Sequence, residues 1–169
     1  MGTRSIIIIT GKEKSQFSEM RASTRLYKHY DGYPTNVLAN LAEAFIGWRN
    51  WEGSICHDSA IEAILAKEMG AKVEAKFEGE FNARRTRRLG NQGDLEWIYV
   101  VNTDTRHIEI YGGGYTDKTP SEVYRLGTVS PYILLDGIKD EYLDGLYNEI
   151  KKAIADLKKI GFTVNARGL

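Results

Sequence analysis

The hydrophobic and polar positions change their period along the chain, and each period predicts one kind of element. Four consecutive isoleucines, Ile6 to Ile9, leave no polar face, which predicts a buried strand in a central position of a sheet. Hydrophobic and polar residues alternate from Glu19 to Tyr30, so a second strand is predicted to pair with the first as a hairpin. Unbroken alternation from Lys72 to Glu78 predicts a strand with one face in water, at or near a sheet edge.

The second half of the chain contains the strongest hairpin signal. Residues 95–101 and 107–111 are strand-like and flank Asn102-Thr103-Asp104-Thr105, a sequence rich in turn-forming residues. Residues 162–164 are predicted to add a last short strand or to dock against the sheet.

Apolar residues at three- and four-residue spacing predict two helices in the first half of the chain. The first follows the turn that ends at Pro34, and Thr35 is its expected N-cap. The second covers residues 59–69, because Ser59 and Glu62 have the spacing of a capping box and Gly70 ends the pattern.

The longest helix is predicted over residues 140–160. Its first turn is acidic and its last turn is basic, which complements the helix dipole, and Gly161 supplies a C-terminal cap. A short helical turn is also predicted from Thr119 to Gly127, because Thr119-Pro120-Ser121-Glu122 combines a cap, a proline and a glutamate at favourable positions.

Strands and helices do not alternate regularly, which disfavours a doubly wound parallel sheet. We expect an α+β protein with an antiparallel or mixed sheet and about three helices packed mainly on one face. With 169 residues, 42% of them hydrophobic and 27% charged, the chain is predicted to be a single globular domain over residues 1–169.

The charge balance limits the classes of partner. Lysines and arginines equal aspartates and glutamates at 23 each, so no overall field favours polyanions or membranes. No apolar run is long enough to cross a bilayer, and the start of the sequence lacks the pattern of a signal peptide. The single cysteine, Cys56, excludes an internal disulfide and fits a reducing compartment, so we expect a cytoplasmic protein.

Polar and aromatic residues are concentrated between Thr24 and Pro34, where an extended strand turns into a helix. The amide groups at the start of that helix could receive an anion if the turn folds back on them, which suggests a phosphate or carboxylate pocket. The alternative is that the aspartate, glycine and proline only form the turn and that the tyrosines pack against the helix. The candidate ligand-binding residues are Arg4, Arg25, His29, Tyr30, Asp31 and Tyr33.

A local basic cluster is the strongest electrostatic feature of the sequence. It contains Arg84, Arg85, Arg87 and Arg88, which are able to contact phosphates or an acidic protein surface. The alternative is an ordinary solvated loop. No aromatic residue interleaves with these arginines, which disfavours a stacking platform for single-stranded nucleic acid.

No motif identifies catalytic residues, a cofactor or a metal. Cys56 precedes His57, but no catalytic signature surrounds the cysteine, and the glycine-containing segments lack the P-loop and dinucleotide patterns. The three histidines lack the paired spacing of known metal sites, so neither a metal nor a cofactor is predicted. A metal site formed by His29, Asp31 and a distant histidine is the alternative.

Residues Thr3-Arg4-Ser5 before an aliphatic strand, and Leu26 to Pro34 before a helix, resemble the opening of a family of small uncharacterised proteins common in phages and prophages. Those proteins similarly begin with a Thr-Arg-Ser strand and continue to a Tyr-x-His/Gln-aromatic-Asp-Gly-Tyr-Pro turn. The resemblance covers the first quarter of the chain, and no catalytic residue can be carried over from it. It implies a phage or mobile-element accessory protein, of a kind that often binds host factors in an infected bacterium.

The leading hypothesis is therefore binding rather than catalysis, with a host protein or nucleoprotein complex as partner and the arginine cluster as one contact. The second hypothesis is a pocket protein that sequesters or hydrolyses a small phosphorylated ligand, such as a nucleotide, at the strand-turn-helix segment. The third is a structural virion component. The sequence does not predict the oligomeric state.

Overall fold

The computed structural model describes residues 4–13, 21–52, 55–67, 69–78, 95–112 and 141–166. Within these ranges it contains six strands and three helices. The arginine cluster and the helical turn predicted at Thr119 lie outside the described residues.

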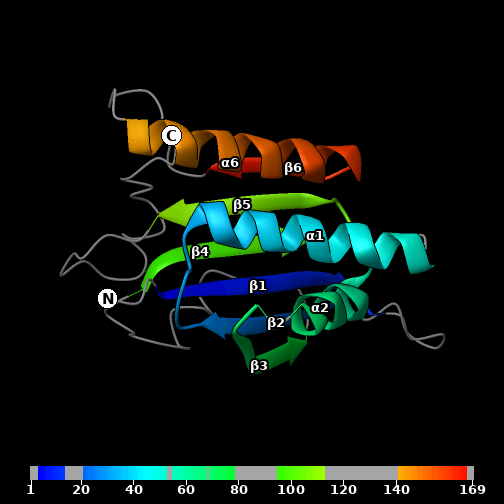
Figure 1. Ribbon diagram of the computed structural model, residues 1–169. Helices are drawn as coiled ribbons and strands as arrows, with labels where there is room; N and C mark the ends of the chain where they lie inside the picture. The colour runs from blue at the N-terminus through cyan, green and yellow to red at the C-terminus, as the bar shows by residue number, and fades with distance from the viewer. Residues whose placement is uncertain are drawn as a thin grey trace.

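Six strands form one mixed sheet in the order β3-β2-β1-β4-β5-β6 (Figure 1). Their bounds are β1 Arg4–Lys12, β2 Arg21–Lys28, β3 Ala71–Glu78, β4 Leu95–Asn102, β5 His107–Gly112 and β6 Thr163–Ala166. Strand β1 lies inside the sheet, antiparallel to β2 and parallel to β4, and the β4–β5 hairpin is antiparallel. The predicted central strand, both hairpins, the edge position of β3 and the short last strand are confirmed.

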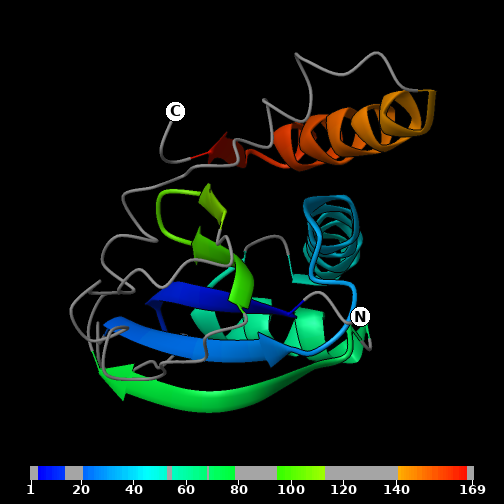
Figure 2. The same cartoon turned by 90° about the vertical axis from the view of Figure 1, so that its left-hand side faces the viewer.

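Three helices, α1 (Pro34–Glu52), α2 (His57–Ala66) and α6 (Glu141–Lys159), lie on one face of the sheet (Figure 2). The α+β fold with helices on one face is therefore confirmed. Strands β5 and β6 are parallel and α6 precedes β6 in the chain, so this part of the sheet has a crossover connection that the sequence pattern does not predict. None of the described helices combines the length and the apolar character needed to cross a bilayer.

Two of the predicted helix starts are wrong. Helix α1 begins at Pro34 rather than after Thr35, because a proline at the first helical position has no amide hydrogen to leave unpaired. Helix α2 begins at His57, with Cys56 as its N-cap and Ser59 at the third helical position. Ser59 is therefore the third helical residue of the capping box and not its N-cap.

The isoleucines of β1 serve two hydrophobic clusters because successive side chains of a strand point to opposite faces. Ile7 and Ile9 pack in the cluster that includes the helix residues, whereas Ile6 and Ile8 pack with Ile98 and Val100. All four isoleucines are at most 1% exposed. Burial on both faces is what fixes β1 in the interior of the sheet.

The alternation of β2 determines which of its polar residues meet the helices. Leu26 belongs to the cluster that contains the helix residues, and Thr24 and Lys28 share its face. Arg25 and Tyr27 pair with Ile8 and Ile6 and point to the opposite face. On the side that α2 covers, β2 therefore presents Thr24, Leu26 and Lys28 in this order.

Candidate functional site

A polar pocket lies where β2, the start of α1 and the segment after α2 meet. Its volume is about 340 Å³, which is at the lower end of the range for small-molecule sites. The strand contributes one lysine, the turn before α1 contributes a tyrosine and an aspartate, and α1 contributes two asparagines one helical turn apart. We call it the Lys28 pocket. Its lining residues are Lys28, Tyr30, Asp31, Asn36, Asn40, Met69 and Gly70.

Lys28 is the unusual member of this set because it is only 6% exposed. Its ammonium group donates a hydrogen bond to the carbonyl oxygen of Met69. Burial lowers the pKa of Lys28 below its usual value, and the nearby charge of Asp31 partly opposes that shift. The pocket therefore holds a desolvated cation beside an exposed carboxylate.

The turn that carries Tyr30 and Asp31 is held by backbone conformation and by one buried contact. Asp31 has a φ of 54°, a left-handed conformation that aspartate tolerates better than most residues. The hydroxyl of Tyr99 in β4 donates a hydrogen bond of 2.7 Å to the carbonyl oxygen of Gly32, and burial raises the pKa of Tyr99 well above its usual value. A neutral, fully buried tyrosine thus ties the turn to the middle of the sheet.

The structure brings only two of the predicted ligand residues, Tyr30 and Asp31, into this pocket. His29 is half-buried, with its Nδ1 2.9 Å from the Tyr27 hydroxyl and its ring in a T-shaped contact with the ring of Tyr30. The carbonyl oxygen of Tyr33 accepts hydrogen bonds from the first amides of α1. His29 and Tyr33 therefore support the turn and do not line the pocket.

The two predicted arginines that the structure describes lie elsewhere. Arg25 is 1% exposed, on the opposite face of β2 from Lys28, and its Nε lies 3.1 Å from Oε2 of Glu74. Arg4 begins β1 and is half-buried. Neither residue lines the Lys28 pocket.

Sequence reasoning missed five of the lining residues: Lys28, Asn36, Asn40, Met69 and Gly70. A signal existed for two of them, because asparagines four positions apart on a helix share one face. The inward position of Lys28 follows from its phase in β2, which places it with Thr24 and Leu26. Met69 and Gly70 come from a distant part of the chain, and no local pattern connects them with the turn.

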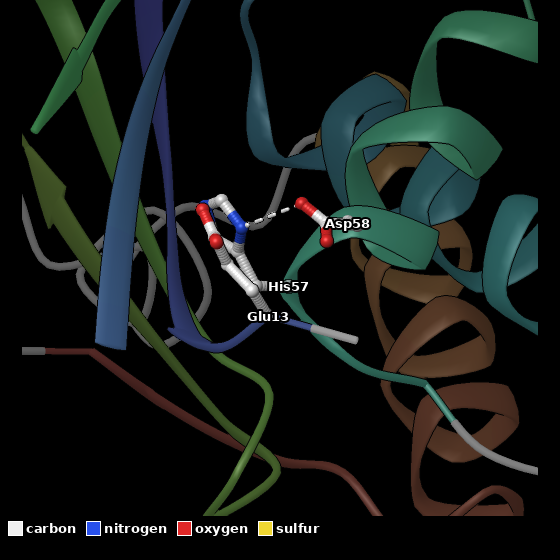
Figure 3. A group of neighbouring side chains, drawn as sticks. All are labelled: Glu13, His57 and Asp58. Carbon is white, nitrogen blue, oxygen red and sulfur yellow. Dashed lines mark hydrogen bonds and ion pairs between the residues drawn. The ribbon is translucent and has the colours of Figure 1, made fainter. Parts of the chain in front are cut away.

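A second polar cluster lies at the other end of α2 and centres on His57, which is completely buried (Figure 3). The Nε2 of His57 lies 2.9 Å from Oγ1 of Thr24 in β2, and its Nδ1 lies 3.2 Å from Oδ1 of Asp58. Glu13, directly after β1, brings a carboxylate to the same group, and one ligand atom each of Glu13, His57 and Asp58 lies within 4.8 Å of the other two. Within the described ranges this is the group that could hold a metal ion, and it contains neither His29 nor Asp31.

A chain of hydroxyl, imidazole and carboxylate also occurs in nucleophilic hydrolases, but burial disfavours that chemistry here. Thr24 is 0% exposed, so a substrate carbonyl has no access to its hydroxyl. Cys56 serves as the N-cap of α2, with its amide donating to Oγ of Ser59 at 2.7 Å and its sulfur 3.2 Å from the same oxygen. These contacts give Cys56 a structural role at the helix start.

Comparisons of the chain with models of protein families, with curated proteins and with solved structures give no match.

Proposed function

We propose that this protein binds a small anionic ligand of the nucleotide class in the Lys28 pocket. The observation that carries the proposal is the buried ammonium group of Lys28 in the wall of a polar pocket of about 340 Å³. Removing an ammonium group from water is costly, and the cost is recovered when an anion binds beside it.

The other lining residues match the remaining parts of a mononucleotide. The side chains of Asn36 and Asn40 offer amide donors and acceptors, and the carboxylate of Asp31 accepts hydrogen bonds from sugar hydroxyls or from an amino group. The ring of Tyr30 is 64% exposed and is available for stacking against a base. The pocket thus combines one cationic, several hydrogen-bonding and one aromatic component.

A purely structural role for Lys28 explains less. The contact with Met69 uses one of the three donors of an ammonium group, and it satisfies a carbonyl beyond the end of α2. A neutral donor would satisfy the same carbonyl without burying a charge. The ligand hypothesis accounts for both the charge and the adjoining pocket.

Binding is favoured over catalysis. Among the described residues that line the pocket there is no cysteine, serine or histidine, and we assign the two ionisable side chains that remain besides the tyrosine, Lys28 and Asp31, to binding the ligand. We therefore assign sequestration or sensing of the ligand, and not its hydrolysis, to this pocket.

The proposal is tested by calorimetric titration of the full chain with a panel of mononucleotides and with inorganic phosphate. Wild-type protein should bind one nucleotide per chain, and Lys28→Met should weaken that binding by about tenfold or more, because a charge-assisted hydrogen bond is lost. Lys72→Met is the matched control: it removes the same charge from an exposed lysine that stacks over Tyr27 and does not line the pocket. Equal affinities in the two variants would refute the assignment, and binding of phosphate alone would restrict the ligand to its anionic part.

The wider biological setting stays a proposal that rests on the resemblance. A phage accessory protein in the cytoplasm of an infected bacterium that captures a nucleotide would act on a host signal. Contact with a host protein or nucleoprotein through Arg84, Arg85, Arg87 and Arg88, and a role in the virion, also stay predictions.

A further inference from the structure

One imidazole nitrogen and two carboxylates converge at the start of α2, at the end of the helix opposite the Lys28 pocket. Glu13 comes from the end of β1, while His57 and Asp58 form the first turn of α2 (Figure 3). The ligand atoms of all three lie within 4.8 Å of one another. We propose that this group binds one divalent transition-metal ion, for which zinc is the test ion.

The spacing fits the first coordination shell of such an ion. Ligand bonds to zinc are about 2.0–2.2 Å long, so two ligands of a tetrahedral site lie roughly 3.3–3.6 Å apart. The distance from His57 Nδ1 to Asp58 Oδ1 is 3.2 Å, close to that value. Glu13 follows the last residue of β1, and its ligand atom lies within 4.8 Å of the other two. A small movement of the Glu13 side chain would therefore bring all three ligand atoms to coordinating distance of one ion.

Thr24 supplies the outer contact that a histidine ligand needs. A metal on Nδ1 requires the proton of the neutral ring to be on Nε2, where it donates to Oγ1 of Thr24 at 2.9 Å. Histidines that ligate metals usually donate their other ring hydrogen in this way, which fixes both the tautomer and the ring orientation. Both Thr24 and His57 are 0% exposed, so the ring is held rigidly before an ion arrives.

The local charges favour a cation despite the helix dipole. The N-terminus of a helix acts as about half a positive charge, whereas Glu13 and Asp58 supply two carboxylates. The Asp58 side chain is 40% exposed, which leaves a route for the ion from solvent. Imidazole is a good ligand for zinc and its neighbours in the transition series and a poor one for Mg²⁺ or Ca²⁺, so a transition metal is the expected class.

Three protein ligands leave at least one coordination position for water. Structural zinc sites are usually closed by four protein ligands, whereas sites with three keep an exchangeable position. The proposal is independent of the nucleotide proposal, because none of its residues lines the Lys28 pocket.

The test is calorimetric titration of the chelator-treated full chain with zinc chloride, followed by the visible spectrum of the protein with Co²⁺. Wild-type protein should bind one ion per chain, and Asp58→Asn and Glu13→Gln should each weaken binding by about tenfold or more. Thr24→Val should lower affinity by about 10–100-fold, and Thr24→Ser, which keeps the hydroxyl, should restore it.

Two control variants separate this site from general surface binding. Glu62→Gln removes an exposed carboxylate from the same helix, and His107→Gln removes a histidine whose Nε2 lies 2.7 Å from Asn165. Both should bind zinc with wild-type affinity. The proposal is overturned if wild-type protein shows no saturable binding, or if Asp58→Asn and Glu13→Gln bind zinc as tightly as the two controls.

Discussion

Two nitrogen-containing side chains, His57 and Lys28, are buried between β2 and the two ends of α2, and their surroundings differ. At the start of the helix, the ring nitrogens of His57 contact Thr24 and Asp58. Beyond its end, Lys28 contacts the carbonyl oxygen of Met69 and faces an open polar pocket. The first setting holds a ring with both nitrogens in contact with polar side chains, while the second places an ammonium group in the wall of a pocket.

The separation of these settings comes from β2. Thr24 and Lys28 lie four residues apart on one face of the strand, which corresponds to about 13 Å. Leu26 lies between them on the same face and is 0% exposed. An apolar side chain thus divides two polar clusters, so a single interface between one strand and one helix carries two separate groups of polar residues.

Replacing Leu26, the leucine between the two clusters, should have the largest effect on the free energy of unfolding. Leu26→Ala deletes a fully buried side chain and should lower the free energy of unfolding by about 2–5 kcal/mol, because it leaves a cavity between β2 and the helices. Urea denaturation checks this value. Leu65→Ala is the control, since Leu65 is 40% exposed on α2 and its replacement should cost much less. Equal losses in the two variants would mean that Leu26 contributes no more to the core than an exposed leucine.

A smaller effect is expected at the glycine beside the pocket. Gly70 has a φ of 64°, and an added methyl group would lie 3.8 Å from Nζ of Lys28. Gly70→Ala should therefore lower the free energy of unfolding by about 1 kcal/mol, as expected for a left-handed alanine, and should reduce nucleotide affinity by narrowing the pocket. Gly47→Ala is the control, because apart from the adjacent backbone of its own helix nothing lies within 4 Å of its added methyl group. Unchanged nucleotide affinity in Gly70→Ala would place the ligand outside this pocket.

The smallest effect should be the pH dependence of stability and of ligand affinity, which we expect at the Lys28 end of α2. Because the pKa of Lys28 is lowered from 10.5, the folded protein binds this proton less tightly than the unfolded chain. Lys28 should therefore make the folded state more stable as pH rises from the lowered pKa toward 10.5, and Lys28→Met should remove that rise. Affinity for an anionic ligand should fall over the same range as the ammonium loses its charge. Urea denaturation and nucleotide titration between neutral pH and 10.5 measure both trends, and an affinity that stays constant would exclude Lys28 as the anion contact.

Much of the fold could be predicted because its signals are local. Four isoleucines in a row require burial on both faces, and the alternation of β3 and of the β4–β5 hairpin gives their positions. The start of α2 was mispredicted because the spacing of Ser59 and Glu62 matches a capping box, whereas the N-cap is Cys56. A residue pattern does not distinguish these two starts without the backbone geometry.

The sites were harder to predict because each joins distant segments. The turn at Tyr30 and Asp31 could be identified from the sequence. The place of Lys28 in a pocket could not, because Met69 and Gly70, which complete the pocket, come from a distant part of the chain. The sequence places His57 beside Cys56, whereas in the fold its ring contacts Thr24 and lies near Glu13, both of which are far away in sequence. Arg25 lies on the same strand face as Tyr27, which contacts His29, but this face is on the other side of the sheet from Lys28, and Arg25 pairs there with Glu74.

The most direct test of the central claim is native mass spectrometry of wild-type protein and Lys28→Met, each mixed with the same panel of mononucleotides. The account predicts one adduct of nucleotide mass per chain on wild-type protein and a much smaller fraction of the same adduct on Lys28→Met at equal nucleotide concentration. Absence of an adduct on wild-type protein, or equal adducts on both proteins, would contradict it.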